Sequence, residues 1–134
     1  MKTFNEYLSE GIVRKVSPDT SRANALVSEA INRYDFVMSI KITDSNANYI
    51  VENVYDLIME LVRAKMFKEG YMARNSHEAE VSYTLSLNFS QSEISFLDEL
   101  RYFRNGILYY GKRFDKDYAD RVLVFLDKIY SKLS

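Results

Sequence analysis

The residues best suited to chemistry lie close together in the chain: Arg101, Tyr102, Arg104, Asn105 and Tyr109. On an α-helix, where each residue turns the chain by about 100°, these five side chains share one polar side. A guanidinium group binds phosphate in a bidentate fork, tyrosine rings stack on bases, and an amide can read a base edge or a sugar. The pattern is therefore typical of a surface that binds RNA or a nucleotide.

Two basic residues, Lys112 and Arg113, follow this segment, and we expect them to contact a ligand or partner together with Arg101 and Tyr102. Arginine and tyrosine also dominate the hot spots of protein–protein interfaces. On composition alone, a protein interface such as a dimer contact is favoured over a nucleic-acid surface. The 18 basic and 19 acidic residues give a net charge of -1, so any binding of nucleic acid must come from this local patch.

The composition argues against several other kinds of site. Cysteine is absent, which rules out disulfides, thiolate catalysis and zinc–thiolate sites. His77 is the only histidine, and its place beside Ser76 at a helix start favours a part in a helix cap over catalysis. Three acidic pairs are also better explained by capping and the helix dipole than by Mg²⁺ binding: Glu78/Glu80, Asp98/Glu99 and Asp115/Asp117. We therefore predict no metal and no cofactor.

The length and hydropathy indicate a single domain over residues 1–134. No apolar run approaches the ~20 residues that a membrane-spanning helix needs. The segment Met1 to Glu10 is polar and does not resemble a signal peptide. We expect a cytoplasmic protein without a membrane contact.

Apolar residues recur at helical spacing along most of the chain, and the single proline and four glycines leave few interruptions. Capping boxes begin at Thr3 and Ser90, and Ser17 and Asp117 are the expected N-caps of two further helices. The sequence predicts a short helix from Thr3 toward Val16, and then helices over about 17–40, 47–69, 76–87, 90–110 and 117–133. We therefore predict an all-α fold, an up-and-down antiparallel bundle of four to six helices.

The third of these helices, Ala47 to Glu69, has the broadest apolar face and should be the most buried, with Gly70 ending it. Tyr71 to Asn75 is predicted to be a loop. The segment Val81 to Leu87 alternates with period two, as a strand would. We still predict a helix there, because a lone strand would have no partner elsewhere in the chain.

The helix over 90–110 has a predicted core stripe of Phe96, Leu100, Phe103, Ile107 and Tyr110. Arg104 falls on the border of this stripe, between Leu97 and Leu108 along the axis. We therefore expect Arg104 to be mostly covered, by the protein itself or by a dimer partner.

The segment Arg104 to Gly111, with the sequence RNGILYYG, resembles the signature helix of HEPN domains, in which an Arg and a polar residue are followed after a short stretch by His. Upstream, Gly70-Tyr71 and Ser76-His77 resemble the HEPN segment in which a glycine ends a central helix and a Ser/Thr-His pair opens the next. The resemblance covers roughly residues 17–134. It implies a helical bundle that forms a homodimer and acts on RNA or nucleotides, or pairs with a small nucleotidyltransferase in a toxin–antitoxin system.

The resemblance makes Arg104, Asn105 and Tyr109 the candidate catalytic residues, with Tyr109 standing where the family has His. Tyrosine has an ordinary pKa near 10, against about 6.5 for histidine, and is a poor general base at neutral pH. The leading hypothesis is therefore a HEPN-like module that binds RNA, a nucleotide or a nucleotidyltransferase partner without efficient catalysis. A metal-independent ribonuclease that uses Arg104 and Tyr109 is one alternative, and a structural homo-oligomerisation domain is another.

Overall fold

The computed structural model describes residues 1–134, apart from the side chains of Leu108 and Tyr109. The described chain is mostly helical, with two short strands and one 3-10 helix. Its elements are α1 (Phe4–Ser9), β1 (Val13–Lys15), α2 (Thr20–Ser39), α3 (Ala47–Glu69), β2 (Tyr71–Ala73), α4 (His77–Tyr83), η1 (Thr84–Leu87), α5 (Gln91–Tyr110) and α6 (Lys116–Leu133). The predicted all-α helical bundle is confirmed. Within the part of the chain described, no helix is long and apolar enough to cross a membrane.

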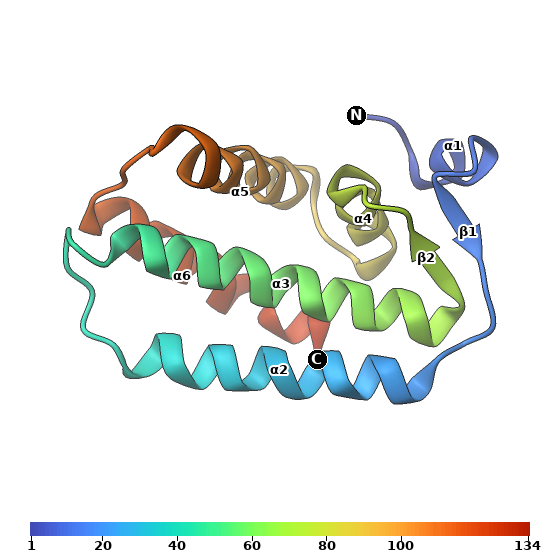
Figure 1. Ribbon diagram of the computed structural model, residues 1–134, viewed down its shortest axis with the longest axis horizontal. Coiled ribbons are helices and arrows are strands. Elements are labelled where there is room, and N and C mark those ends of the chain that lie inside the picture. The colour runs from blue at the N-terminus through green and yellow to red at the C-terminus, as the bar shows by residue number, and fades with distance from the viewer.

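Helix α3 is the centre of the bundle. Helix α2 runs antiparallel along one side of it, and α4, α5 and α6 pack on its other sides (Figure 1). Side chains are buried all around α3, among them Ile50, Tyr55, Leu57 and Ile58, as the breadth of its apolar face predicted. Burial of each such side chain stabilises the fold by ~1.5–3 kcal/mol, so α3 is the fixed frame against which the polar residues of α4 and α5 are placed.

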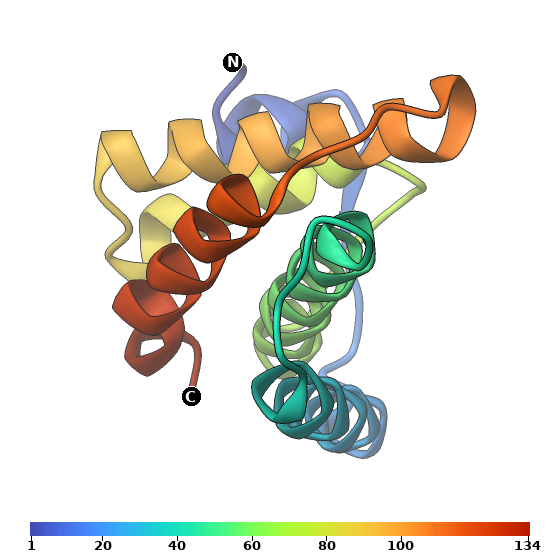
Figure 2. The same cartoon turned by 90° about the vertical axis from the view of Figure 1, so that its left-hand side faces the viewer.

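Helix α5 lies across α3 rather than along it. Figure 2 views α3 almost end-on, whereas α5 runs across the same view and its C-terminal end extends past α3. The buried apolar residues of α5 that the structure describes lie in its first half, at Ile94, Leu97 and Leu100, whereas Ile107 in its second half is only partly buried. Tyr110, which was predicted on the core stripe, is 86% exposed, so this part of the prediction is wrong. A stripe with helical period is buried only as far as a neighbouring element accompanies it.

The N-terminal segment differs from the prediction. Helix α1 ends at Ser9 instead of continuing toward Val16, and β1 follows it. Strand β1 pairs antiparallel with β2, which occupies most of the predicted loop 71–75. The backbone N–H of Val16 then donates to the carbonyl of Gly70 at 2.8 Å, and Gly70 is the left-handed C-cap of α3. The sequence did not predict these strands, because they lie far apart in the chain and three residues are too few to show the alternation of a strand.

The helix starts are set by side-chain caps. The capping boxes at Thr3 and Ser90 are both present, and Ser76 caps α4 as predicted. The cap of α2 is Asp19 rather than Ser17, because the N–H of Asp19 is held by the carbonyl of Phe67 and the chain before it stays extended. The cap of α6 also differs from the predicted residue, and it lies two residues earlier in the chain.

Asp115, and not Asp117, accepts the hydrogen bond from the N–H of Tyr118 and so begins α6. The next N–H, of Lys116, donates to the side chain of Asp44 at 2.8 Å, which fixes the start of the helix from outside. Asp117 lies in the first turn, where a carboxylate stabilises the helix dipole. The segment 81–87 is helical as predicted, through α4 and η1.

Candidate functional site

A cluster of polar and charged side chains lies where α4 and α5 meet the buried helix α3. Helix α3 contributes Tyr55 and Asp56, α4 contributes His77, and α5 contributes Arg104. The apolar sides of the three helices pack together, and this packing positions the polar groups at the edge of the core. Such clusters of partly buried titratable groups are candidates for function.

The ring of His77 packs on Tyr55. Nδ1 of His77 lies 2.8 Å from the Tyr55 hydroxyl, and the two rings are stacked with centroids 5.9 Å apart. Burial raises the pKa of Tyr55 above its ordinary value, so the phenol keeps its proton. Its hydroxyl can then donate to Nδ1, and a neutral imidazole that accepts at Nδ1 carries its own proton on Nε2.

His77 is half-buried, and this burial is the main reason why its pKa is lowered from the ordinary value of 6.5. The positive charges of Arg63 and Arg104 act in the same direction, whereas the negative charges of Glu80 and Asp56 oppose them. The imidazole is therefore neutral at neutral pH. It is close enough to Arg104 and Asp56 for all three groups to share one electrostatic environment.

Arg104 is held beside Asp56. Nη2 of Arg104 lies 3.2 Å from Oδ1 and 3.5 Å from Oδ2 of Asp56, and the two side chains are 24% and 27% exposed. Nε of Arg104 is buried and has no hydrogen-bond partner among the described residues. The prediction that Arg104 is mostly covered is confirmed within a single chain, and its guanidinium group keeps donors that Asp56 does not use.

The neighbouring arginines are bound more completely. Arg63 makes a two-point contact with the buried carboxylate of Glu80, at 2.6 and 2.9 Å. Arg101 donates to Asp98 at 2.8 Å and lies 3.6 Å from Glu78, with a side chain that is 19% exposed. Arg101, a predicted ligand contact, is thus already occupied by carboxylates, and Arg104 is the arginine of this cluster with the loosest partner.

The remaining predicted residues differ in their surroundings. Tyr102 is 69% exposed, as expected for a contact residue, and Asn105 is half-buried. Lys112 instead packs on aromatic rings, with Nζ 4.6 Å from the ring centre of Phe103. Arg113 is exposed in the loop that follows α5.

The prediction for Tyr109 concerns a side chain outside the described residues. Its backbone belongs to the last turn of α5. The comparison of Tyr109 with the family's His therefore rests on the sequence alone.

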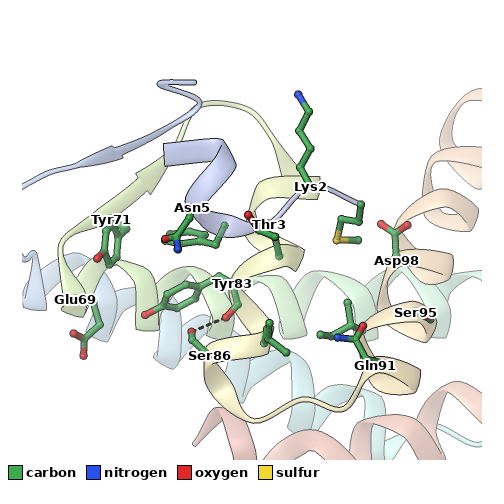
Figure 3. A pocket seen from close by; sticks show the side chains of 15 residues that line it. Lys2, Thr3, Asn5, Glu69, Tyr71, Tyr83, Ser86, Gln91, Ser95 and Asp98 are labelled. Carbon is green, nitrogen blue, oxygen red and sulfur yellow. Dashed lines mark hydrogen bonds between the residues drawn. The ribbon is translucent and has the colours of Figure 1, made fainter. Parts of the chain in front are cut away.

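Two surface pockets lie elsewhere on the described chain, and neither is lined by Arg104 or His77. The larger, of about 1010 Å³, lies between the N-terminal segment, η1 and the start of α5. Figure 3 shows Tyr71, Tyr83 and Glu69 at one end of it and Gln91, Ser95 and Asp98 at the other. The smaller, of about 620 Å³, is lined by Tyr7, Ser76 and Glu78 among others. Hydroxyl, amide and aromatic groups dominate the lining of the larger pocket.

The sequence interpretation missed two members of the cluster, Tyr55 and Asp56. It named His77, but favoured a part in a helix cap over catalysis. Asp56 had a signal in the sequence, as a carboxylate beside a buried aromatic residue in the most apolar helix. No family model, no curated protein and no solved structure matches this chain.

Proposed function

We propose that this chain is a HEPN-like module that binds RNA or a nucleotide through a phosphate group at Arg104, without efficient catalysis. The observation that carries the proposal is the state of Arg104. Its guanidinium group is held in place at the edge of the core, with one loose carboxylate partner and a buried Nε that no described residue accepts from. A planar, preorganised guanidinium group with unused donors is suited to an anion with several oxygens, such as phosphate.

Asp56 has a defined part in this proposal. A carboxylate that faces a guanidinium group keeps it extended and oriented in the absence of ligand. Because both side chains remain about one-quarter exposed, a phosphate can reach the guanidinium group from solvent. The surrounding carboxylates reduce the net positive charge, so binding should be local and of moderate strength rather than spread over the whole surface.

The lack of efficient catalysis follows from the residue types. General acid–base help is typically worth ~10²–10⁴-fold in rate, and it needs a group whose pKa lies near the working pH. At the position where the family has His, this chain has Tyr109. Arg104 can stabilise the negative charge on phosphoryl oxygens, so binding can persist where cleavage does not. In the ribonuclease alternative that the resemblance suggests, Tyr109 acts as the acid or the base together with Arg104.

A second candidate is association with a protein partner, which is either a second copy or a small nucleotidyltransferase. The observation that favours it is the exposure of Tyr102 and Tyr110 on the outer part of α5. Large exposed aromatic side chains are enriched in interfaces. The two candidates are compatible, since a partner that packs on this end of α5 would leave Arg104 at the border of the interface.

The proposal is tested by a gel-shift with generic single-stranded RNA at low and moderate salt. Binding through phosphate releases counterions, so the affinity should fall steeply as the salt concentration rises. The logarithm of the binding constant should fall against the logarithm of the salt concentration with a slope of roughly 0.7 per phosphate neutralised. Absence of any shift at low salt, or a shift that salt does not weaken, would contradict the proposal. In the latter case the contact would be apolar, as expected for a protein interface.

A further inference from the structure

His77 is placed more elaborately than a helix cap requires. The cap of α4 is already supplied by Ser76, whose hydroxyl accepts the N–H of Ala79 at 3.2 Å. The imidazole instead lies against Tyr55, half-buried, on the side of α4 that faces α3 and α5. A histidine that served only to begin the helix would gain nothing from this desolvation.

We propose that His77 is a second phosphate contact of the Arg104 site, and that the ligand is bound together with a proton on His77. This inference rests on the proposed function, because it concerns the same ligand. It assigns to His77 a role that the signature segment 104–111 does not supply. It also identifies the ligand as an anion, because a bound negative charge favours uptake of a proton by His77.

The geometry brings one donor from each of two helices to adjacent residues of α3. Arg104 of α5 is held by Asp56, and His77 of α4 is held by Tyr55, the residue next to Asp56 in α3. Adjacent residues of a buried helix cannot move independently. The two donors are therefore fixed relative to each other through α3, as the two sides of an anion site must be.

The charge around His77 decides how it responds to an anion. The charged groups that act on it from the packed elements are Asp56 and Arg63 of α3, Glu80 of α4 and Arg104 of α5, and the hydroxyl of Tyr55 on α3 contacts its ring nitrogen. Without ligand, burial and the two arginines hold the pKa of His77 below 6.5, so the ring is neutral near pH 7. A phosphate bound at Arg104 offsets the arginine charge and favours the imidazolium form, which offers a second charged donor. By linkage, the affinity for the anion must rise as the pH falls.

This inference can be tested directly because His77 is the only histidine of the chain. An NMR titration of the imidazole signals reports its pKa without any assignment problem. The titration is run on the full chain alone and with a short single-stranded oligoribonucleotide, and repeated with inorganic phosphate as the smaller probe. We expect the pKa of His77 to rise by roughly one pH unit with either probe, which corresponds to about a tenfold gain in affinity between high and low pH.

Two variants separate a ligand contact from a structural role. In Arg104→Ala, the pKa of His77 without ligand should rise, because a nearby positive charge is removed, and the further rise caused by the probe should vanish. Arg22 of α2, which lies over Phe67, is the matched control. In Arg22→Ala, the pKa of His77 without ligand and its rise with the probe should both equal those of the wild type. His77→Gln should retain part of the binding but lose most of its dependence on pH.

The outcomes distinguish the two proposals. If RNA binds in an Arg104-dependent way while the pKa of His77 does not change, the inference about His77 is overturned and the proposed function stands. If neither RNA nor phosphate binds to the wild type, the proposed function fails and the inference fails with it. If the pKa of His77 rises with RNA but not with inorganic phosphate, the contact between His77 and the ligand is retained and is assigned to the nucleic-acid backbone.

Discussion

Arg104 of α5 and Asp56 of α3 form an ion pair with a closest distance of 3.2 Å, in which both side chains stay partly exposed. Under the proposed function, a ligand phosphate would take the place that Asp56 occupies opposite the guanidinium group in the free protein. Asp56→Asn should therefore increase the affinity for single-stranded RNA, by roughly threefold to tenfold, because a competing negative charge is removed.

The control for this change is Asp127→Asn, which removes the same charge from an exposed position on α6. Affinity measured by fluorescence anisotropy should be nearly unchanged in the control. A loss of affinity in Asp56→Asn, with the fold intact by circular dichroism, would mean that the carboxylate itself contacts the ligand or that Arg104 needs it for its orientation.

The turn at Gly70 gives a prediction about stability. Gly70 has φ +83°, and an added Cβ would come within 2.6 Å of the carbonyl oxygen of Val16. Gly11 has φ +76° with no described atom within 4 Å, so it serves as a matched control for backbone strain alone. We expect Gly11→Ala to cost about 1 kcal/mol of unfolding free energy and Gly70→Ala about 1–3 kcal/mol more.

Urea denaturation of the two glycine variants measures this difference. Equal losses would show that the Val16 carbonyl can move aside, and that the contact between the β1 segment and the end of α3 is not rigid.

Glu93 gives a prediction about acid stability. Burial alone would raise its pKa, but the hydrogen bonds from Lys132 and from the backbone N–H of Ser90, with the charges of Lys132 and Lys128, lower the pKa below its ordinary value of 4.5. The contact with Lys132 measures 2.7 Å and joins the end of α6 to the start of α5. This contribution to stability is complete above about pH 4.5 and is lost as the pH falls through the lower folded-state pKa.

Glu93→Gln should therefore reduce the unfolding free energy by at least about 1 kcal/mol at neutral pH and by much less near pH 3. Thermal unfolding at a series of pH values, with Glu29→Gln on the exposed side of α2 as control, follows the effect. The same loss at both ends of the series would contradict an electrostatic origin.

The sequence was sufficient where the signal is local. Gly70 and Gly111 end α3 and α5 in the left-handed conformation, as their positions after apolar helical segments predicted. The breadth of the apolar face identified α3 as the central helix. These features depend on residues close in the chain, whose spacing the sequence records directly.

The sequence was insufficient where distant segments meet. The pairing of Val13 with Ala73 has no periodic signal, and the exposure of Tyr110 depends on how far α5 extends past α3. Arg104 was found from its neighbours on one helix. Its partners on α3 and α4 could not be found in this way, because contacts between helices follow from packing and not from spacing within one helix.

Tyr109 gives a prediction about catalysis. If the chain lacks efficient ribonuclease activity because a phenol stands where the family has His, Tyr109→His should gain cleavage of single-stranded RNA, by at least ~10²-fold over the wild type. The assay contains EDTA to exclude metal-dependent contaminants, and the double variant Tyr109→His with Arg104→Ala should lose the gain. Strong cleavage by the wild type that disappears in Arg104→Ala would instead favour the ribonuclease alternative.

The most direct test of the account is the affinity of single-stranded RNA for the wild type, Arg104→Ala and Arg22→Ala at one low salt concentration, measured by fluorescence anisotropy. A charged hydrogen bond is worth ~1.5–3 kcal/mol, so Arg104→Ala should bind at least about tenfold more weakly. Arg22→Ala, which removes the same charge from α2, should bind within about twofold of the wild type. A folded Arg104→Ala protein that binds RNA as tightly as the wild type would contradict the assignment of the phosphate site to Arg104.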